Sequence, residues 1–90
     1  MKTLADNREL YDYLLFLSAE LKRRGAAALS EAVAFASAQG SSSSTEFLGE
    51  SRIALRRVLS EENGALSDQQ RNDVMDVLKQ LGAALDETRQ

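Results

Sequence analysis

The sequence predicts an all-α fold, a compact four-helix bundle with short connections in an up-and-down or an orthogonal arrangement. Proline is absent, and β-branched residues are scarce beside plentiful alanine, leucine, glutamate, glutamine and arginine, which favours helix along most of the chain. Apolar residues recur with helical spacing in several separate segments. Glycine and serine interrupt the pattern three times, so that four segments result. A chain of 90 residues is expected to form one helical domain, 1–90, around a single core.

The first helix is expected over residues 6–24 and contains the most apolar run of the chain. Asp6 and Glu9 have the spacing of a capping box at its start, and three basic residues precede Gly25 at its end. Four leucines follow one another at intervals of four, three and four residues, which predicts one buried stripe: Leu10, Leu14, Leu17 and Leu21.

Three large residues of the same helix lie away from this stripe and form the predicted partner-binding surface: Tyr11, Leu15 and Phe16. Together with the leucine stripe they make the middle of the helix apolar almost all round. Two interpretations follow from that pattern. Either the helix is central and has neighbours on more than one side, or its second apolar face contacts another protein chain.

A second helix is expected over residues 26–39, and half of its residues are alanine. Small side chains allow a neighbouring helix to come close, and Phe35 is predicted to fill the space that the alanines leave. The segment 40–44 reads Gly-Ser-Ser-Ser-Ser and is predicted to be a flexible link. Ser43 and Glu46 have the spacing of a capping box for the next helix.

A third helix is expected over residues 44–62. Most of its apolar residues share one face, but Ile53 points away from that face and lies between charged residues. An exposed apolar residue beside arginine is the composition that binding hot spots favour. We therefore predict a secondary binding patch of Ile53, Arg56 and Arg57.

Residues 45–52, Thr-Glu-Phe-Leu-Gly-Glu-Ser-Arg, followed by Leu55 and Val58, resemble the turn and recognition helix of helix-turn-helix DNA-binding proteins. The resemblance implies a turn at Gly49 and a set of groove-facing side chains: Ser51, Arg52, Arg56 and Arg57. The same residues also fit one continuous helix that carries Gly49 in its interior, and this is the interpretation that we favour.

A fourth helix is expected over residues 67–88. Asn63 and Gly64 both tolerate the left-handed conformation of a helix C-terminus, and Ser67 with Gln70 gives a further capping box. The apolar spacing of four, three and four returns here in Val74, Leu78, Leu81 and Leu85.

The composition excludes several kinds of chemistry. Without histidine or cysteine the chain cannot form a histidine-based triad, a thiol nucleophile, a zinc site of the usual ligands or a disulfide, so we predict no enzyme activity, no catalytic residue, no metal and no cofactor. A net charge of −3 and an isoelectric point of about 4.9 argue against general binding of nucleic acid. No stretch has the length and apolarity of a membrane span or a secretory signal, and we expect a cytoplasmic protein.

We therefore expect a non-enzymatic protein–protein interaction module, whose partner is another protein or a second copy in a homodimer. The pattern offers no small-molecule substrate. A helix-turn-helix regulator acting through residues 45–59 is one alternative. A small acidic inhibitor, or an immunity-type binder of a basic enzyme, is another, which the size and the charge suggest.

Overall fold

The computed structural model describes residues 7–41 and 44–88, and all regular secondary structure within them is helical. The elements are α1 (Asn7–Arg23), α2 (Ala27–Ala38), the 3-10 turn η1 (Gln39–Ser41), α3 (Ser44–Glu61) and α4 (Asp68–Thr88). The predicted four-helix bundle is confirmed, and each helix ends within one residue of the expected position. Asp6, Ser43 and part of the predicted link at 40–44 lie outside the described residues.

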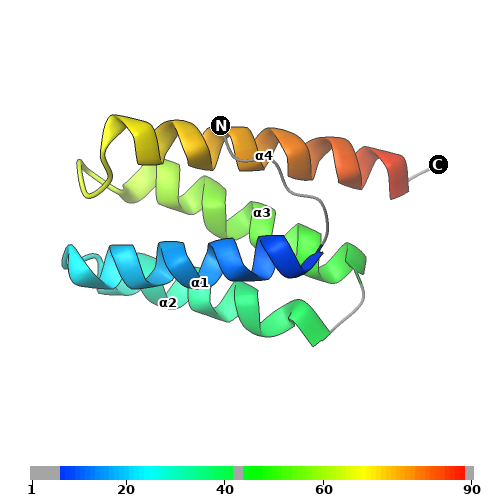
Figure 1. Cartoon of the computed structure of the whole chain (residues 1–90), viewed down its shortest axis with the longest axis horizontal. Coiled ribbons are helices and arrows are strands. Elements are labelled where there is room, and N and C mark those ends of the chain that lie inside the picture. The colour runs from blue at the N-terminus through cyan, green and yellow to red at the C-terminus, as the bar shows by residue number, and fades with distance from the viewer. Residues whose placement is uncertain (1–6, 42–43, 89–90) are drawn as a thin grey trace.

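Consecutive helices run in alternate directions along the long axis of the molecule (Figure 1). The arrangement is therefore up-and-down and not orthogonal. The backbones approach most closely within the hairpins α1–α2 and α3–α4, and between α2 and α3. Since each connection spans only a few residues, antiparallel neighbours are the arrangement that such links allow.

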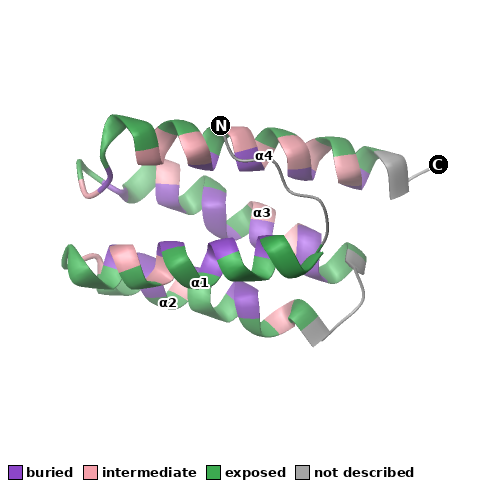
Figure 2. Ribbon diagram, viewed as in Figure 1, coloured by how far each residue is buried: buried purple, intermediate pink, exposed green. Residues whose placement is uncertain are grey.

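The core lies between the inner faces of all four helices (Figure 2). The leucine stripe of α1 is buried as predicted, and the fully enclosed side chains of the other helices include Val33, Leu55 and Val77. Every helix thus contributes an apolar stripe at helical spacing to one cluster. Burial of these stripes is the main stabilising contribution to the fold.

Two serines hold α1 and α2 close together. The Ser18 hydroxyl donates to the Ser30 carbonyl oxygen at 2.9 Å, and the Ser30 hydroxyl donates to the Ser18 carbonyl oxygen at 2.8 Å. The two hydroxyl oxygens are 3.1 Å apart. Because serine is small and each hydroxyl finds an acceptor on the facing backbone, the helices approach without an unpaired polar group between them.

Residues with positive φ end α1 and α3 where the sequence predicts helix ends. Gly25 has φ 83°, and the bonds Gly25 N–H to Lys22 O and Ala26 N–H to Leu21 O form a Schellman motif. After α3, Asn63 and Gly64 have φ 47° and 84°. Both turns reverse the chain sharply and so create the two hairpins.

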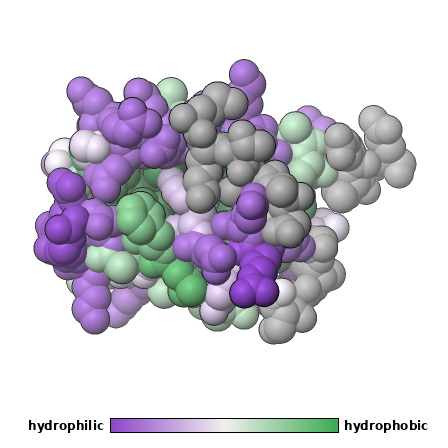
Figure 3. Space-filling model, viewed as in Figure 1, coloured by the Kyte–Doolittle hydropathy of each residue, from purple (hydrophilic) through white to green (hydrophobic). Residues whose placement is uncertain are grey.

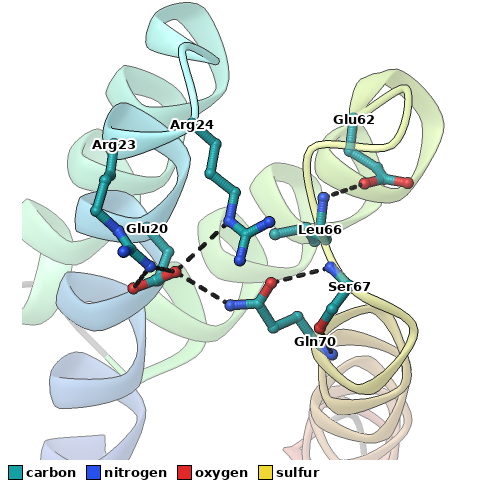
Figure 4. Close-up of polar contacts among 7 residues, drawn as sticks. All are labelled: Glu20, Arg23, Arg24, Glu62, Leu66, Ser67 and Gln70. Carbon is teal, nitrogen blue, oxygen red and sulfur yellow. Dashed lines mark hydrogen bonds and ion pairs between the residues drawn. The ribbon is translucent and has the colours of Figure 1, made fainter.

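The predicted capping box begins α4. The Ser67 hydroxyl accepts the Gln70 backbone N–H at 3.1 Å, and Gln70 Oε1 accepts the Ser67 N–H at 3.0 Å. The Gln70 side chain also donates to Glu20 on α1 at 3.2 Å. Figure 4 shows Arg23, Arg24 and Gln70 converging on Glu20, so that one carboxylate connects the end of α1 to the start of α4.

The environment of Glu20 favours its charged form. The hydrogen bond from Arg23 is the largest influence and, with the bond from Gln70, it outweighs partial desolvation. The pKa of Glu20 is therefore lowered from its ordinary value.

Glu62 follows α3 directly and is buried, although it is an ionisable residue. Its Oε2 accepts the Leu66 N–H at 2.8 Å, and its Oε1 pairs with Arg71 Nη2 at 3.1 Å (Figure 4 shows the bond to Leu66). Burial alone would raise the pKa of Glu62. The hydrogen bonds from Leu66, Arg71 and the Gly64 backbone outweigh that effect and hold the pKa below the ordinary value of 4.5.

We expect Glu62→Gln to reduce the dependence of stability on acidic pH. Because the pKa of Glu62 is lower in the folded chain than in the unfolded chain, its charged form stabilises the fold above the ordinary pKa, and this contribution disappears as the pH falls through the folded value. Glutamine keeps the shape but loses the charge, at a cost of about 1 kcal/mol near neutral pH. Urea unfolding between about pH 6 and pH 3 should show the two curves converging as the pH falls. A constant difference across that range would contradict the assignment.

Candidate protein-binding surface

Helix α1 has an inner face that belongs to the core and an outer face that does not. The leucine stripe and Tyr13 are buried on the inner side. Burial and, to a lesser extent, the charge of Asp73 on α4 raise the pKa of Tyr13 above its ordinary range, so Tyr13 stays neutral between the helices. The inner face is therefore fully committed to packing within this chain.

The three residues of the predicted partner-binding surface lie outside the core. Leu15 is 43% exposed and Phe16 is 55% exposed, whereas Tyr11 is 39% exposed. The space-filling view in Figure 3 shows a hydrophobic patch over α1, surrounded by hydrophilic side chains. Of the two interpretations of α1, complete enclosure of these three residues by the other helices is therefore wrong.

Tyr11 differs from the other two residues in its surroundings. It lines a cavity of about 540 Å³ at the N-terminal end of α1 together with Ser37 and Gly40. A Cβ atom placed on Gly40 would lie 3.5 Å from Tyr11 Cδ1, so the tyrosine ring lies against the backbone of η1. Tyr11 thus helps to close the bundle, and Leu15 and Phe16 carry most of the free apolar surface. We call these three residues the α1 patch.

A second exposed apolar surface lies between α2 and α3. Phe35 is 61% exposed and Ile53 is 63% exposed, and both line a shallow groove of about 300 Å³ whose floor includes Ala32 and Ala54. The prediction that Phe35 fills space between the helices is wrong. Phe35 is two residues after the buried Val33, about 200° around α2, so it points away from the core and lines the edge of the groove.

The secondary patch predicted from the sequence is only partly assembled. Ile53 and Arg57 line the same groove. Arg56 is exposed but does not line that groove, because it is on the other side of Ile53 around α3. Arg57 Nε pairs with Glu61 at 3.0 Å along the helix. The sequence analysis missed Phe35 as a member of this surface. Helical spacing could have found it, because Phe35 is two residues after the buried Val33 and therefore about 200° around α2 from the core.

The segment that resembles a helix-turn-helix forms one continuous helix. Gly49 lies within α3, so the turn that the resemblance implies is absent, and the continuous-helix interpretation is correct. Ser51 is buried, and its hydroxyl donates to the Phe47 carbonyl oxygen at 2.7 Å. The expectation that Ser51 faces a DNA groove is therefore wrong. Arg52 is half-buried, while Arg56 and Arg57 are exposed.

No family model matches the chain, and no curated protein or solved structure matches it. The described residues contain no cluster of three or more potential metal ligands. Within the same residues, no helix is long and apolar enough to cross a membrane.

Proposed function

We propose that this chain is a non-enzymatic, cytoplasmic protein–protein interaction module that binds its partner through the α1 patch. One observation carries the proposal: Leu15 and Phe16 are exposed next to each other on a helix whose opposite face already forms the core. Single exposed apolar residues are common on proteins, but adjacent large ones within a charged surround resemble the centre and rim of an interface.

The energetics support a docking role for this patch. Full burial of a leucine or phenylalanine side chain contributes about 1.5–3 kcal/mol, so the two residues together offer a substantial gain to any partner that covers them. Arg8 and Asp12 are exposed beside the patch and would form part of its polar rim. The groove between α2 and α3 also exposes two large apolar residues, Phe35 and Ile53, but they belong to different helices, whereas Leu15 and Phe16 are adjacent on one helix.

The proposal predicts that a photo-reactive residue at position 16 captures the partner. Phe16 is replaced by benzoylphenylalanine in the producing cell, and the covalent adducts are identified by mass spectrometry. Met75 on α4 is exposed to a similar degree and serves as the control position. We expect a defined adduct from position 16 that is absent from position 75. Equal or absent cross-linking at both positions would contradict the proposal.

Charged substitutions give an independent test of the same patch. Leu15→Glu or Phe16→Glu should abolish association because burying an unpaired carboxylate is costly, whereas helicity should stay unchanged because both positions are exposed. Association of Leu15→Glu is measured as the loss of the adduct from benzoylphenylalanine at position 16, and association of Phe16→Glu as the loss of the adduct from the same residue placed at position 15. Helicity is measured by circular dichroism. A loss of helicity would show that these side chains stabilise the fold of the chain itself.

A further inference from the structure

Four exposed residues form a line along the outside of α1, and we call this line the outer stripe. They are Asp12, Phe16, Ala19 and Arg23, and their spacing is four, three and four residues. The buried leucines have the same spacing two positions earlier, starting from Leu10. Since two residues rotate a helix by about 200°, the outer stripe lies almost opposite the core.

The side chains of the outer stripe can pair with those of a second, antiparallel copy of α1. Read forward, the order is acidic, large apolar, small apolar and basic. An antiparallel second helix of the same sequence presents these classes in reverse order. Asp12 then faces Arg23 of the second copy, and Phe16 faces Ala19 of the second copy.

We propose that the occupant of the α1 patch is a second copy of this chain, docked with its α1 antiparallel across a two-fold axis. This inference rests on the proposed docking role of α1. The Asp12–Arg23 ion pair and the Phe16–Ala19 contact each occur twice, as an interface with two-fold symmetry requires. A parallel pairing would instead place Asp12 against Asp12 and Arg23 against Arg23, which like-charge repulsion disfavours.

The charged ends of the outer stripe are available for such pairs. Asp12 forms no ion pair or hydrogen bond with any other residue that the structure describes. The Arg23 side chain is 69% exposed and uses Nη2 to bind Glu20, with N–O distances of 2.6 and 2.8 Å. A guanidinium group has five N–H donors in all, so Arg23 can bind a second carboxylate.

The size of the contact indicates a weak dimer. Helix α1 has 17 residues and is about 25 Å long, so a contact between two such helices falls below the roughly 800 Å² per partner of a standard interface. Dissociation constants between about 10 µM and 1 mM are the range to search. Leu15 flanks the outer stripe and adds apolar area to this contact.

Reversal of the charges tests the antiparallel register. Sedimentation equilibrium up to about 1 mM should give a monomer–dimer equilibrium for the natural sequence, and Asp12→Arg or Arg23→Asp should each weaken it at least about tenfold. An equimolar mixture of these two variants should dimerise again, because each unlike pair restores both ion pairs. The Asp12→Arg variant is expected to keep its fold, since Asp12 is exposed and forms no ion pair or hydrogen bond within residues 7–41 and 44–88.

Lys22→Asp is the matched control, because it makes the same charge change one residue from Arg23 but about 100° away from the outer stripe. Lys22 lies on the same flank of α1 as Leu15 and not on the outer stripe itself, so Lys22→Asp should weaken the dimer much less than Arg23→Asp does. Any of three results would overturn the antiparallel dimer. The natural chain could stay monomeric up to 1 mM, the dimer could be unaffected by the single charge reversals, or the mixture of folded variants could stay monomeric.

The cross-linking experiment separates this inference from the proposed function. An adduct at position 16 with twice the mass of the chain supports the second copy. An adduct with a different protein, together with a monomeric chain in solution, refutes the second copy and leaves the docking role of α1 standing. A missing adduct refutes the docking role itself.

Discussion

Leu14→Ala should destabilise the protein by about 2–5 kcal/mol, whereas Leu15→Ala should change its stability by no more than about 1 kcal/mol. The two residues are neighbours of the same chemistry on α1, but Leu14 is fully enclosed in the core and Leu15 is on the outer surface. Removing the Leu14 side chain leaves an enclosed cavity, while removing that of Leu15, which is 43% exposed, leaves a gap at the surface that water can fill. Urea unfolding of both variants, monitored by circular dichroism, measures the difference.

The effects of the same two substitutions on partner binding should be the reverse of their effects on stability. Leu15→Ala should reduce cross-linking from position 16, because Leu15 adds apolar contact area beside Phe16. Leu14→Ala should keep cross-linking under conditions in which it remains folded. Similar losses of stability in both variants would show that α1 is enclosed on both sides.

Phe47→Ala should destabilise the fold by about 3–5 kcal/mol, and Phe35→Ala by no more than about 0.5 kcal/mol. Phe47 on α3 is 1% exposed and belongs to the core, while Phe35 projects from α2 into solvent. For a domain of this size such a loss removes a large part of the total stability. Thermal unfolding should therefore show a much lower Tm for Phe47→Ala alone.

This comparison also tests the outward position of Phe35. The sequence suggested that Phe35 occupies space between alanines, and in that position its removal would leave a cavity as costly as the one at Phe47. Equal destabilisation by the two substitutions would therefore show that Phe35 is buried. An unchanged Tm for Phe35→Ala would agree with the groove that it lines together with Ile53.

Local signals along the chain predicted the helices and their ends well. Gly25, Asn63 and Gly64 adopt positive φ at the expected helix termini, and Ser67 and Gln70 form the expected capping box. These features depend on neighbours within a few residues, so the sequence contains nearly all the information that decides them. The apolar spacing of α1 likewise predicted which leucines are buried.

The sequence analysis missed the features that depend on distant contacts. Ser18 and Ser30 are twelve positions apart, and nothing in either neighbourhood indicated that they bond to each other across α1 and α2. Glu62 was predicted as the end of a helix, but its carboxylate is buried where the turn after α3 folds back toward Arg71 on α4. Pairs of this kind form only when the helices pack against each other, so the local sequence does not reveal them.

The sequence by itself determined that this protein is a bundle of four helices, where they begin and end, and that α1 has more apolar surface than one face of a helix needs. Only the tertiary structure decided that the surplus side chains at Leu15 and Phe16 lie outside. The outward position of Phe35 and the buried position of Ser51 agree with helical spacing, because Phe35 is two residues from the buried Val33 and Ser51 is four residues from both Phe47 and Leu55. The physical reason is that helical periodicity fixes which residues share a face, whereas the distance between packed helices decides how wide a part of that face is covered. The small residues between α1, α2 and α3 bring those helices close, and their larger neighbours remain on the surface.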